Sequence, residues 1–384
     1  RDCIAQLATD LRTIIQETQL SFFEATTALA FEAFAQGGVE VAVIEVGMGG
    51  RLDATNVVAP ALTVVTGIEL DHTKSLGTTR EQIAAEKAGI MKPSTPLLMA
   101  PSAAGVEEVF RRRGASLRAP VYKLEERALL EAVEPRPQGT WFRFHRPAGR
   151  SHHTSGRGGG HPLPRGMIGA ACGHRVPAAR ERNIRLLGAH QARNALLAEE
   201  AARLLASVGL TITERARVGG LVRARWPGRF QVLPSSVGRP VCILDVAHNP
   251  SGCETVVTTY RHWMNGDVAP TLPTLIVGML GDKDHRSFFR ILRGISDRVY
   301  LIPLRSTRAG PVEDLAQSAH LGGFEPKSFT SMRGALTAAL QLGAPVLITG
   351  SFLTVEAAMD QLGLDAESDL FAPEDVISVG CSGG

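Results

Sequence analysis

Residues 241–250 read VCILDVAHNP, an apolar run that ends in an aspartate and leads into a turn. Similar runs recur at 274–280 (TLIVGML), 299–304 (VYLIPL) and 345–349 (PVLIT), and a segment with helical spacing follows each one. Short apolar runs of this kind are typical of strands that are buried on both faces. Their alternation with helices predicts a doubly wound α/β domain over residues 241–384.

The first half of the chain predicts a second parallel sheet with helices on its faces. Helical patterns occupy residues 20–36, 79–89 and 186–207, and the one at 79–89 opens with capping-box spacing. The β-branched runs at 39–46 (VEVAVIEV) and 61–68 (ALTVVTGI) are predicted to be buried strands.

Composition places the chain among soluble globular proteins. Its 384 residues carry 41 basic and 38 acidic side chains, a net charge of +3, which argues against a nucleic-acid or membrane-surface partner. No apolar run approaches the ~18 residues of a membrane helix. The five cysteines are scattered without a C-x-x-C pair, which favours reduced thiols and a cytoplasmic location.

Residues 134–182 fit neither domain, because they are rich in Arg, His, Gly and Pro and have no apolar period. They could form a basic loop, or a metal-binding tract with His152, His153 and His161. A disordered insert, or an altered reading frame that ends near Ile184, explains this composition better.

Charged side chains stand at the predicted strand ends of the first half. Glu45 ends an apolar strand, Asp71 and His72 follow the next one, and Lys87 closes the helix after it. Carboxyl ends of parallel strands share one edge of a sheet, where ligands bind. The group suits a metal–nucleotide site, and a strand-end salt bridge beside a hydrogen-bonded histidine explains it equally well.

The second half shows the same arrangement. Asp245 ends a strand, His248 lies in the turn, and Pro250 suits the first position of a helix. The turns at 281–285 (GDKDH) and 349–351 (TGS) also follow predicted strands. Each turn alone is typical of an ordinary helix start or a solvated loop, but together they predict a shared ligand edge.

Several blocks, in order along the chain, resemble the bifunctional dihydrofolate synthase/folylpolyglutamate synthase family of the Mur ligase superfamily. The first is EVGMGGRLDATN at 45–56, which separates folate ligases from the cell-wall ligases of that superfamily. The others are GIELDHTKSLG, AAEKAGIMKP, GAHQARNALLA, WPGRF, LDVAHNP, DKD and VLITGS.

The resemblance implies a Mur-ligase-like α/β fold. Residues 1–225 would be the remainder of a central parallel-sheet ATPase domain, and 226–240 a connector. Residues 241–384 would be a Rossmann-like glutamate-ligase domain. The family's phosphate-binding loop, G-x-x-x-x-G-K-[ST], does not occur in these 384 residues. We expect it to precede Arg1, and we expect the chain without it to be inactive.

The resemblance also assigns roles to individual residues. Glu45, His72 and a carbamylated Lys87 would hold Mg²⁺, since a carbamate supplies the oxygen that an ammonium cannot. Lys87, His72 and His248 would be catalytic. Asp53, Ser21 and Phe23 would contact the pterin, although a core position explains Phe23 nearly as well. Asn194 would contact the adenine. ATP and the incoming glutamate would be bound by Arg229, Asp245 and His248, and the substrate by Lys283 and Ser351.

The implied activity is ATP-dependent addition of L-glutamate to dihydropteroate or folates through an acyl phosphate, with ATP and Mg²⁺ as cofactors. The partners would be small molecules, and a monomer is the default. Two alternatives stay open. One is a Mur-type ligase that acts on a cell-wall precursor, and the other is a non-catalytic folate- or nucleotide-binding protein.

Overall fold

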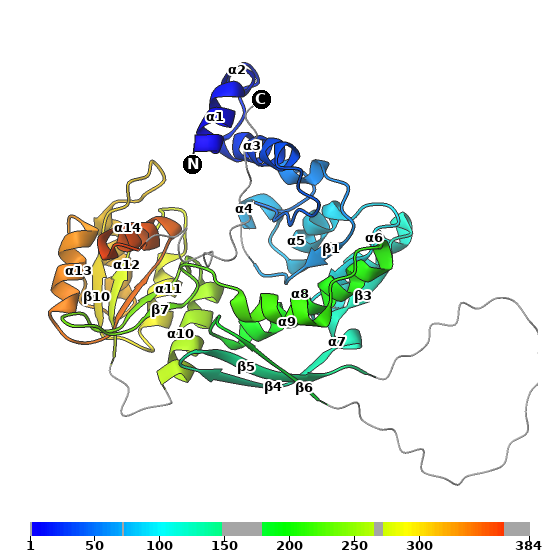
Figure 1. Cartoon of the computed structure of the whole chain (residues 1–384). Helices are drawn as coiled ribbons and strands as arrows, with labels where there is room; N and C mark the ends of the chain where they lie inside the picture. The colour runs from blue at the N-terminus through cyan, green and yellow to red at the C-terminus, as the bar shows by residue number, and fades with distance from the viewer. Residues whose placement is uncertain (1, 71–72, 148–178, 265–271, 365–384) are drawn as a thin grey trace, which may run out of the picture.

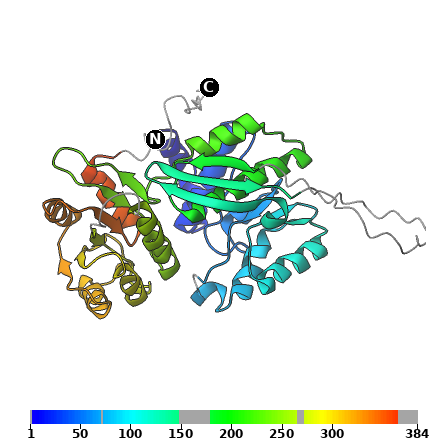
Figure 2. The ribbon, with the colours of Figure 1, turned by 90° about the horizontal axis from the view of Figure 1, so that it is seen from below.

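The computed structural model describes residues 2–70, 73–147, 179–264 and 272–364. These form two lobes, with the C-terminal part of the chain in one and residues 2–225 in the other (Figure 1). Figure 2 shows an antiparallel sheet of the first lobe reaching toward the second. No helix among the described residues has the length and apolarity needed to cross a bilayer.

The C-terminal lobe is built on one six-stranded sheet with the order β11-β10-β9-β12-β8-β7. All neighbours are parallel except β7, which runs antiparallel to β8 at one edge. The predicted doubly wound domain is therefore confirmed. The strands are β7 (Gln231–Leu233), β8 (Cys242–Leu244), β9 (Thr274–Val277), β10 (Arg298–Leu301), β11 (Lys327–Ser328) and β12 (Val346–Thr349).

Helices cover both faces of this sheet, which explains why its central strands are apolar throughout. Ile243 faces one core layer, while its neighbours Cys242 and Leu244 face the other. The first layer contains residues of α10 (Pro250–Met264), α11 (His285–Leu292) and α12 (Val312–Leu321), and the second contains residues of α13 (Met332–Leu340) and α14 (Phe352–Leu362). Cys242 and Cys253 are buried and unpaired, as expected for reduced thiols.

The expected connector at 226–240 is partly a strand of this lobe. Residues 231–233 form β7 and pair with β8, so the turn before them is tied directly to the C-terminal sheet.

The N-terminal lobe contains the second parallel sheet, in the order β1-β2-β3. Thr79 caps α5 through the predicted capping box with Gln82. The elements of this half are α1 (Asp2–Asp10), α2 (Arg12–Glu17), α3 (Phe22–Gln36), η1 (Ala54–Val57), β1 (Thr63–Val65), α4 (Thr73–Leu76), α5 (Arg80–Lys87), η2 (Ala88–Ile90), β2 (Leu97–Met99), α6 (Ala104–Leu117), β3 (Val121–Lys123) and α7 (Leu124–Arg127).

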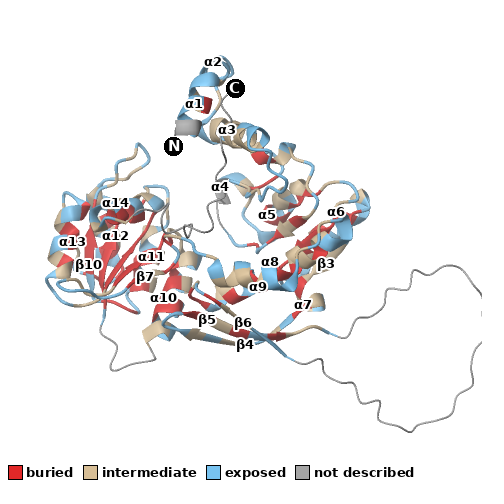
Figure 3. Ribbon diagram, in the orientation of Figure 1, coloured by how far each residue is buried: buried red, intermediate tan, exposed pale blue. Residues whose placement is uncertain are grey.

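The prediction of a buried strand at 39–46 is wrong. Residues 41–46 have no regular structure, and β1 pairs with β2 alone among the described strands. The side chains of Val41 and Val43 are 52% and 94% exposed. A β-branched run becomes a strand only where a neighbour accepts its backbone hydrogen bonds, and this segment has no such neighbour within the described structure. The adjacent α3 also buries none of its residues, as Figure 3 shows.

The prediction that residues 134–182 lack regular structure is wrong at both ends. Three antiparallel strands cross this region: β4 (Leu129–Arg136), β5 (Gly139–His145) and β6 (Arg180–Ile184). Phe142 and Phe144 are buried on one face of β5 while Arg143 is exposed on the other, a two-residue alternation that the many Arg and His residues conceal. The proposed metal tract at 152–161 lies outside the described residues.

Two further helices pack on this antiparallel sheet and lead toward the second lobe. They are α8 (Ala189–Leu204), which η3 (Leu205–Val208) continues, and α9 (Glu214–Arg223). The buried core between them and the sheet includes Phe142, Phe144, Ala192 and Leu196. The first turn of α8 faces the C-terminal lobe, because Gly188 lies against Thr259 of α10.

Candidate functional site

The carboxyl ends of β8, β9 and β12 meet at one edge of the C-terminal sheet, as the sequence predicts. Two contacts join the turns after β8 and β12. Gly350 N–H donates to the carbonyl oxygen of Ala247 at 2.9 Å, and the Thr349 hydroxyl donates to the same oxygen at 3.3 Å. The Thr354 hydroxyl donates to Gly278 O, which connects the end of β9 to α14.

Asp245 is the buried centre of this edge. Its side chain is 9% exposed, and its two carboxylate oxygens accept hydrogen bonds of 2.8 Å from the backbone N–H groups of Phe230 and Ala247. Burial raises the pKa of Asp245 to about 6, although both hydrogen bonds and the nearby Arg229 guanidinium act in the opposite direction. The carboxylate therefore fixes the turn at 226–230 against the end of β8.

That turn has an unusual backbone which the contacts with β8 hold in place. Gly228 has φ +74°, and Phe230, which is not a glycine, has φ +44°. Most residues avoid this left-handed region. Val246 N–H donates to Gly228 O at 2.9 Å, so the turn is bound to the strand end at two points. This places Arg229 on the exposed rim of the edge.

Arg229, His248 and Phe352 gather on that rim. The Arg229 guanidinium lies 5.7 Å from the centroid of the Phe352 ring, and the His248 ring centroid lies 6.3 Å from the same ring. The Nδ1 atom of His248 lies 3.0 Å from Val246 O, which orients the ring. A cation, an imidazole and an exposed aromatic face suit a ligand that combines negative charge with a flat ring.

The first turns of α8 approach the same rim from the other lobe. Burial, together with the positive charges of Arg229 and Arg193, lowers the pKa of His190 to about 4. His190 is therefore close to Arg229 across the two lobes. Asn194, one turn along the helix, is exposed, and its amide nitrogen lies 3.3 Å from Gln191 Oε1.

Ser351 and Lys283 occupy the remaining strand ends. Ser351 is buried, caps α14 through Thr354 N–H, and shares a 2.7 Å hydrogen bond with the Thr354 hydroxyl. These contacts give Ser351 a structural role as the N-cap of α14. Lys283 is half-buried on the turn after β9, beside an exposed ion pair between Asp282 and Arg308.

A cavity of about 430 Å³ opens beside the Arg229 turn. Trp226, Arg229 and Phe230 line it from that turn, and Arg185 and Leu187 line it from the residues that precede α8. The cavity thus lies between the lobes, next to the rim.

The N-terminal lobe brings a second group of predicted residues together. The ring of Phe23 lies against Gly47, so close that a Cβ there would be 2.4 Å from its Cζ atom. Asp53 caps η1, and its carboxylate accepts hydrogen bonds from Met48 N–H at 2.9 Å and Thr55 N–H at 3.0 Å. Burial would raise the pKa of Asp53, but these hydrogen bonds outweigh it and leave the pKa below its usual value.

Ser21 begins α3 and forms a reciprocal capping box with Glu24. Its hydroxyl therefore has a structural role in the first turn of the helix. Phe23, two residues later, is 41% exposed, so the interpretation of Phe23 as an ordinary core residue is wrong.

The structure describes only some of the residues predicted to bind a metal ion. Lys87 is half-buried in the last turn of α5, next to the 47–53 loop, and that loop is anchored there by an ion pair of 3.1 Å between Arg51 and Glu86. Glu45 is exposed, and His72 lies outside the described residues. The described residues contain no group of three or more His, Cys, Asp or Glu side chains with metal-binding geometry.

Two residues of the rim were not singled out from the sequence. His190 lies inside the GAHQARNALLA block and Phe352 follows VLITGS directly, so each stands next to a recognised motif. The contact of Phe352 with Arg229 and His248 depends on the path of the Arg229 turn, and the position of His190 depends on the approach of the two lobes; no local sequence pattern records either.

Three comparisons with known proteins bear on this site. The family described as "Mur ligase, glutamate ligase domain" matches residues 228–352. A dihydrofolate synthase/folylpolyglutamate synthase of Escherichia coli (strain K12) is 33% identical over 352 residues, covering 90% of this chain and 70% of the relative. The corresponding protein of Bacillus subtilis (strain 168) is 31% identical over 301 residues, covering 78% of this chain and 62% of the relative.

A solved structure gives the same answer for the fold. Mycobacterium tuberculosis folylpolyglutamate synthase complexed with ADP matches with a TM-score of 0.76 and 27% identity, covering 95% of this chain and 78% of that one. The chain therefore spans about three fifths to four fifths of the length of these similar proteins.

The buried Asp245 carboxylate predicts a pH dependence of stability. Its folded pKa, about 6, is above the ordinary 3.8, so between these values the folded state holds a proton that the unfolded chain has released. The free energy of unfolding should therefore fall by about 2 kcal/mol as pH rises from 4 to 6, and level off above pH 7. The difference in unfolding free energy between Asp245→Asn and the unsubstituted protein, measured by urea unfolding, should change by that amount over this range.

The unfolding free energies of the two proteins are compared because titration of His190 changes stability with pH in the opposite direction. The lowered pKa of His190 removes stability as pH falls from 6.5 toward 4. The exposed Asp314→Asn is the control for loss of one carboxylate. Parallel pH curves for Asp245→Asn and the unsubstituted protein would contradict the assignment.

Proposed function

The chain belongs to the dihydrofolate synthase/folylpolyglutamate synthase family of the Mur ligase type, and from that premise we propose that the protein joins L-glutamate to dihydropteroate or to a folate at the expense of ATP. The observation that supports this proposal is that Arg229, His248 and Phe352 lie together on the exposed rim. Asp245 fixes the turn that carries Arg229, and α8 approaches the rim from the other lobe.

The chemistry is transfer through an acyl phosphate. A carboxylate oxygen of the pteroate or folate attacks the terminal phosphorus of ATP, and ADP leaves. The amine of glutamate then attacks the acyl carbon, a proton is lost, and inorganic phosphate leaves as the amide forms. Both steps develop negative charge on phosphate oxygens, which positively charged groups stabilise.

The rim supplies groups for the nucleotide and the incoming amino acid. Arg229 offers a planar set of N–H donors to phosphate or carboxylate oxygens, and its position over Phe352 limits its movement. Asn194 of α8 would face the adenine. Asp245 and His248 would both contribute to the binding of ATP and glutamate. Asp245 would do so mainly by fixing the turn that carries Arg229. Lys283 would approach substrate from the neighbouring turn, and Ser351 would shape the rim through its cap.

The folate would bind in the other lobe, at the 47–53 loop. Phe23 presents a partly exposed ring beside Gly47. Asp53 already accepts hydrogen bonds from Met48 N–H, Thr55 N–H and the Thr55 hydroxyl, and a carboxylate can accept about four, so it could receive one N–H group of a pterin. Ser21 would support this group by starting α3 at the correct point.

Mg²⁺ is part of the proposal through Glu45, His72 and a carbamylated Lys87. The donor set of a carboxylate, a carbamate and an imidazole offers the hard oxygens that Mg²⁺ prefers. When bound, the cation would neutralise charge on the phosphate groups. Lys87 stands at the end of α5 beside the 47–53 loop, which begins two residues after Glu45.

The finer predictions on organisation stay predictions. They are a central ATPase domain over 1–225, a cytoplasmic location and a monomeric state. The family's phosphate-binding loop is not among the 384 residues, and we expect the reaction to require it.

The activity test follows ADP release with ATP, Mg²⁺, L-glutamate and dihydropteroate. We expect ADP to form only when both glutamate and dihydropteroate are present, and Arg229→Gln to lower the rate about 10- to 100-fold, because it removes charged hydrogen bonds to the ligand. Arg112→Gln, an exposed arginine of α6, is the matched control and should change nothing.

Three results would contradict the proposal. Ligand binding without ADP formation would indicate a non-catalytic folate or nucleotide binder. Use of a UDP-muramyl substrate in place of dihydropteroate would indicate a cell-wall ligase. An Arg229→Gln variant with full activity would remove the rim from the reaction.

The carbamate hypothesis gives a separate prediction for Lys87. Lys87→Ala should lose ADP-forming activity, and short-chain carboxylates such as acetate should restore part of it, because they can replace the missing oxygen ligand. Arg229→Gln, assayed in the same acetate series, should not recover. If acetate restores no activity to Lys87→Ala at any concentration, the carbamate role is wrong.

A further inference from the structure

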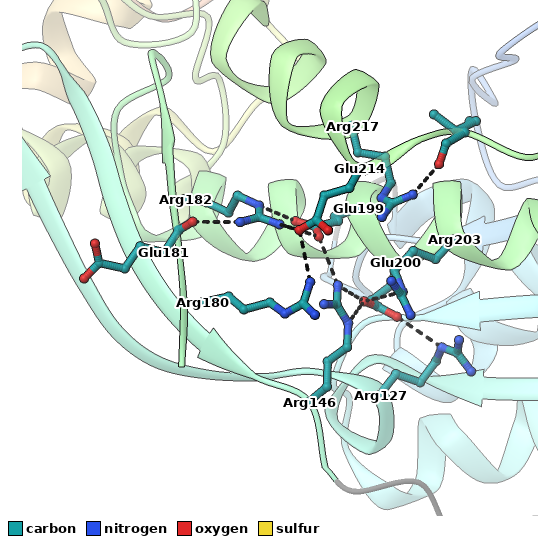
Figure 4. Close-up of polar contacts among 11 residues, drawn as sticks. Arg127, Arg146, Arg180, Glu181, Arg182, Glu199, Glu200, Arg203, Glu214 and Arg217 are labelled. Carbon is teal, nitrogen blue, oxygen red and sulfur yellow. Dashed lines mark hydrogen bonds and ion pairs between the residues drawn. The ribbon is translucent and has the colours of Figure 1, made fainter. Parts of the chain in front are cut away.

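An arginine cluster lies between α8, α9 and the strands β5 and β6, away from the rim (Figure 4). Five guanidinium groups contact three carboxylates there, and a sixth, that of Arg217, donates to the carbonyl oxygen of Ile212 beside them. The residues are Arg127, Arg146, Arg180, Arg182, Arg203 and Arg217 with Glu199, Glu200 and Glu214.

Two of the carboxylates are fully buried and satisfied. The side chains of Glu199 and Glu200 are 0% and 1% exposed. Arg182 donates to Glu199 at 2.9 Å, while Arg146 donates to Glu199 at 3.0 Å and to Glu200 at 2.8 Å. These contacts explain how two carboxyl groups can be buried at this place.

The arginines nevertheless exceed what the glutamates need. Six positive charges against three negative ones leave a surplus of three in the part of the chain that the structure describes. Glu181 does not reduce it, because its carboxylate points away from the cluster, while its carbonyl oxygen accepts from Arg182.

Several buried N–H groups of the cluster also have no hydrogen-bond acceptor among the described residues. They are Nη1 of Arg146 and the Nε atoms of Arg127, Arg203 and Arg217. Buried donors without acceptors are rare and costly in folded proteins. Nε of Arg203 lies 3.6 Å from Glu200, within ion-pair range but without a hydrogen bond.

Arg203 lies near three other arginines of the cluster and near Glu200. Burial lowers its pKa, and the charges of Arg146, Arg217 and Arg180 lower it further. The side chains of Arg203 and Arg180 are 37% and 42% exposed, so a ligand can reach the cluster from solvent.

We propose that Arg146, Arg203 and Arg217 form a binding site for a small dianionic oxyanion, with oxygens of the phosphate or dicarboxylate type. Guanidinium groups match such oxygens in charge and shape. An anion there would offset the surplus charge and accept from N–H groups that otherwise have no acceptor.

This site is separate from the candidate nucleotide rim. His190 and Arg203 lie thirteen residues apart on the same helix, which corresponds to about 20 Å. The proposal therefore stands or falls independently of the ligase activity.

The test is calorimetric titration of the purified chain with sodium phosphate at pH 8, at constant ionic strength made up with sodium chloride, with sodium glutarate as a second titrant. We expect saturable binding of at least one of the two, and the tighter one identifies the chemistry. Arg203→Gln and, independently, Arg217→Gln should each weaken it about tenfold or more, since each removes charged hydrogen bonds.

Two controls separate this site from other arginines. Arg112→Gln removes an exposed arginine on α6, and Arg229→Gln removes the arginine of the rim. Neither should change the affinity. Arg217→Gln leaves the ion pairs of both buried glutamates in place, so it gives a folded variant even where Arg203→Gln is destabilised.

Three outcomes would overturn the proposal: no binding of either anion beyond the effect of chloride, unchanged affinity in Arg217→Gln, or loss of binding in Arg229→Gln.

Discussion

The buried Asp245 carboxylate is the constraint on which the candidate site depends. It accepts hydrogen bonds from the backbone on both sides of it, at Phe230 and Ala247. Through them the end of β8 determines the path of the turn that carries Arg229. The cost of burying the carboxylate is visible in its raised pKa. Without this group, neither the left-handed backbone of Phe230 nor the position of Arg229 over Phe352 has a clear cause.

Helix α8 connects this constraint to the rest of the molecule. Its first turn brings His190 to the rim. Its last two turns carry Glu199 and Glu200, whose ion pairs with Arg146 and Arg182 attach the helix to the antiparallel sheet. Ion pairs therefore hold α8 on one side of the rim, whereas backbone hydrogen bonds to Asp245 hold the Arg229 turn on the other side.

The sequence predicted what depends on local pattern and missed what depends on partners. The C-terminal sheet and the meeting of its polar strand ends at one edge could be predicted, because apolar strands that end in polar turns carry that information in short stretches such as 241–250. The run at 39–46 has equally good strand composition but no neighbour to pair with in the described structure. Residues 134–145 showed the reverse error, since arginines concealed the alternation around Phe142. His190 was missed because only the approach of the lobes gives it a role.

We propose that the adenine nucleotide binds at the rim between α8 and the Arg229 turn. Photolabelling with 8-azido-ATP, followed by mass mapping of the modified peptides, tests it most directly, because the reactive group sits on the adenine itself. The account predicts label within residues 188–194 or 226–230, and loss of the label when ATP competes. Label confined to other peptides, or label that ATP does not displace, would contradict it.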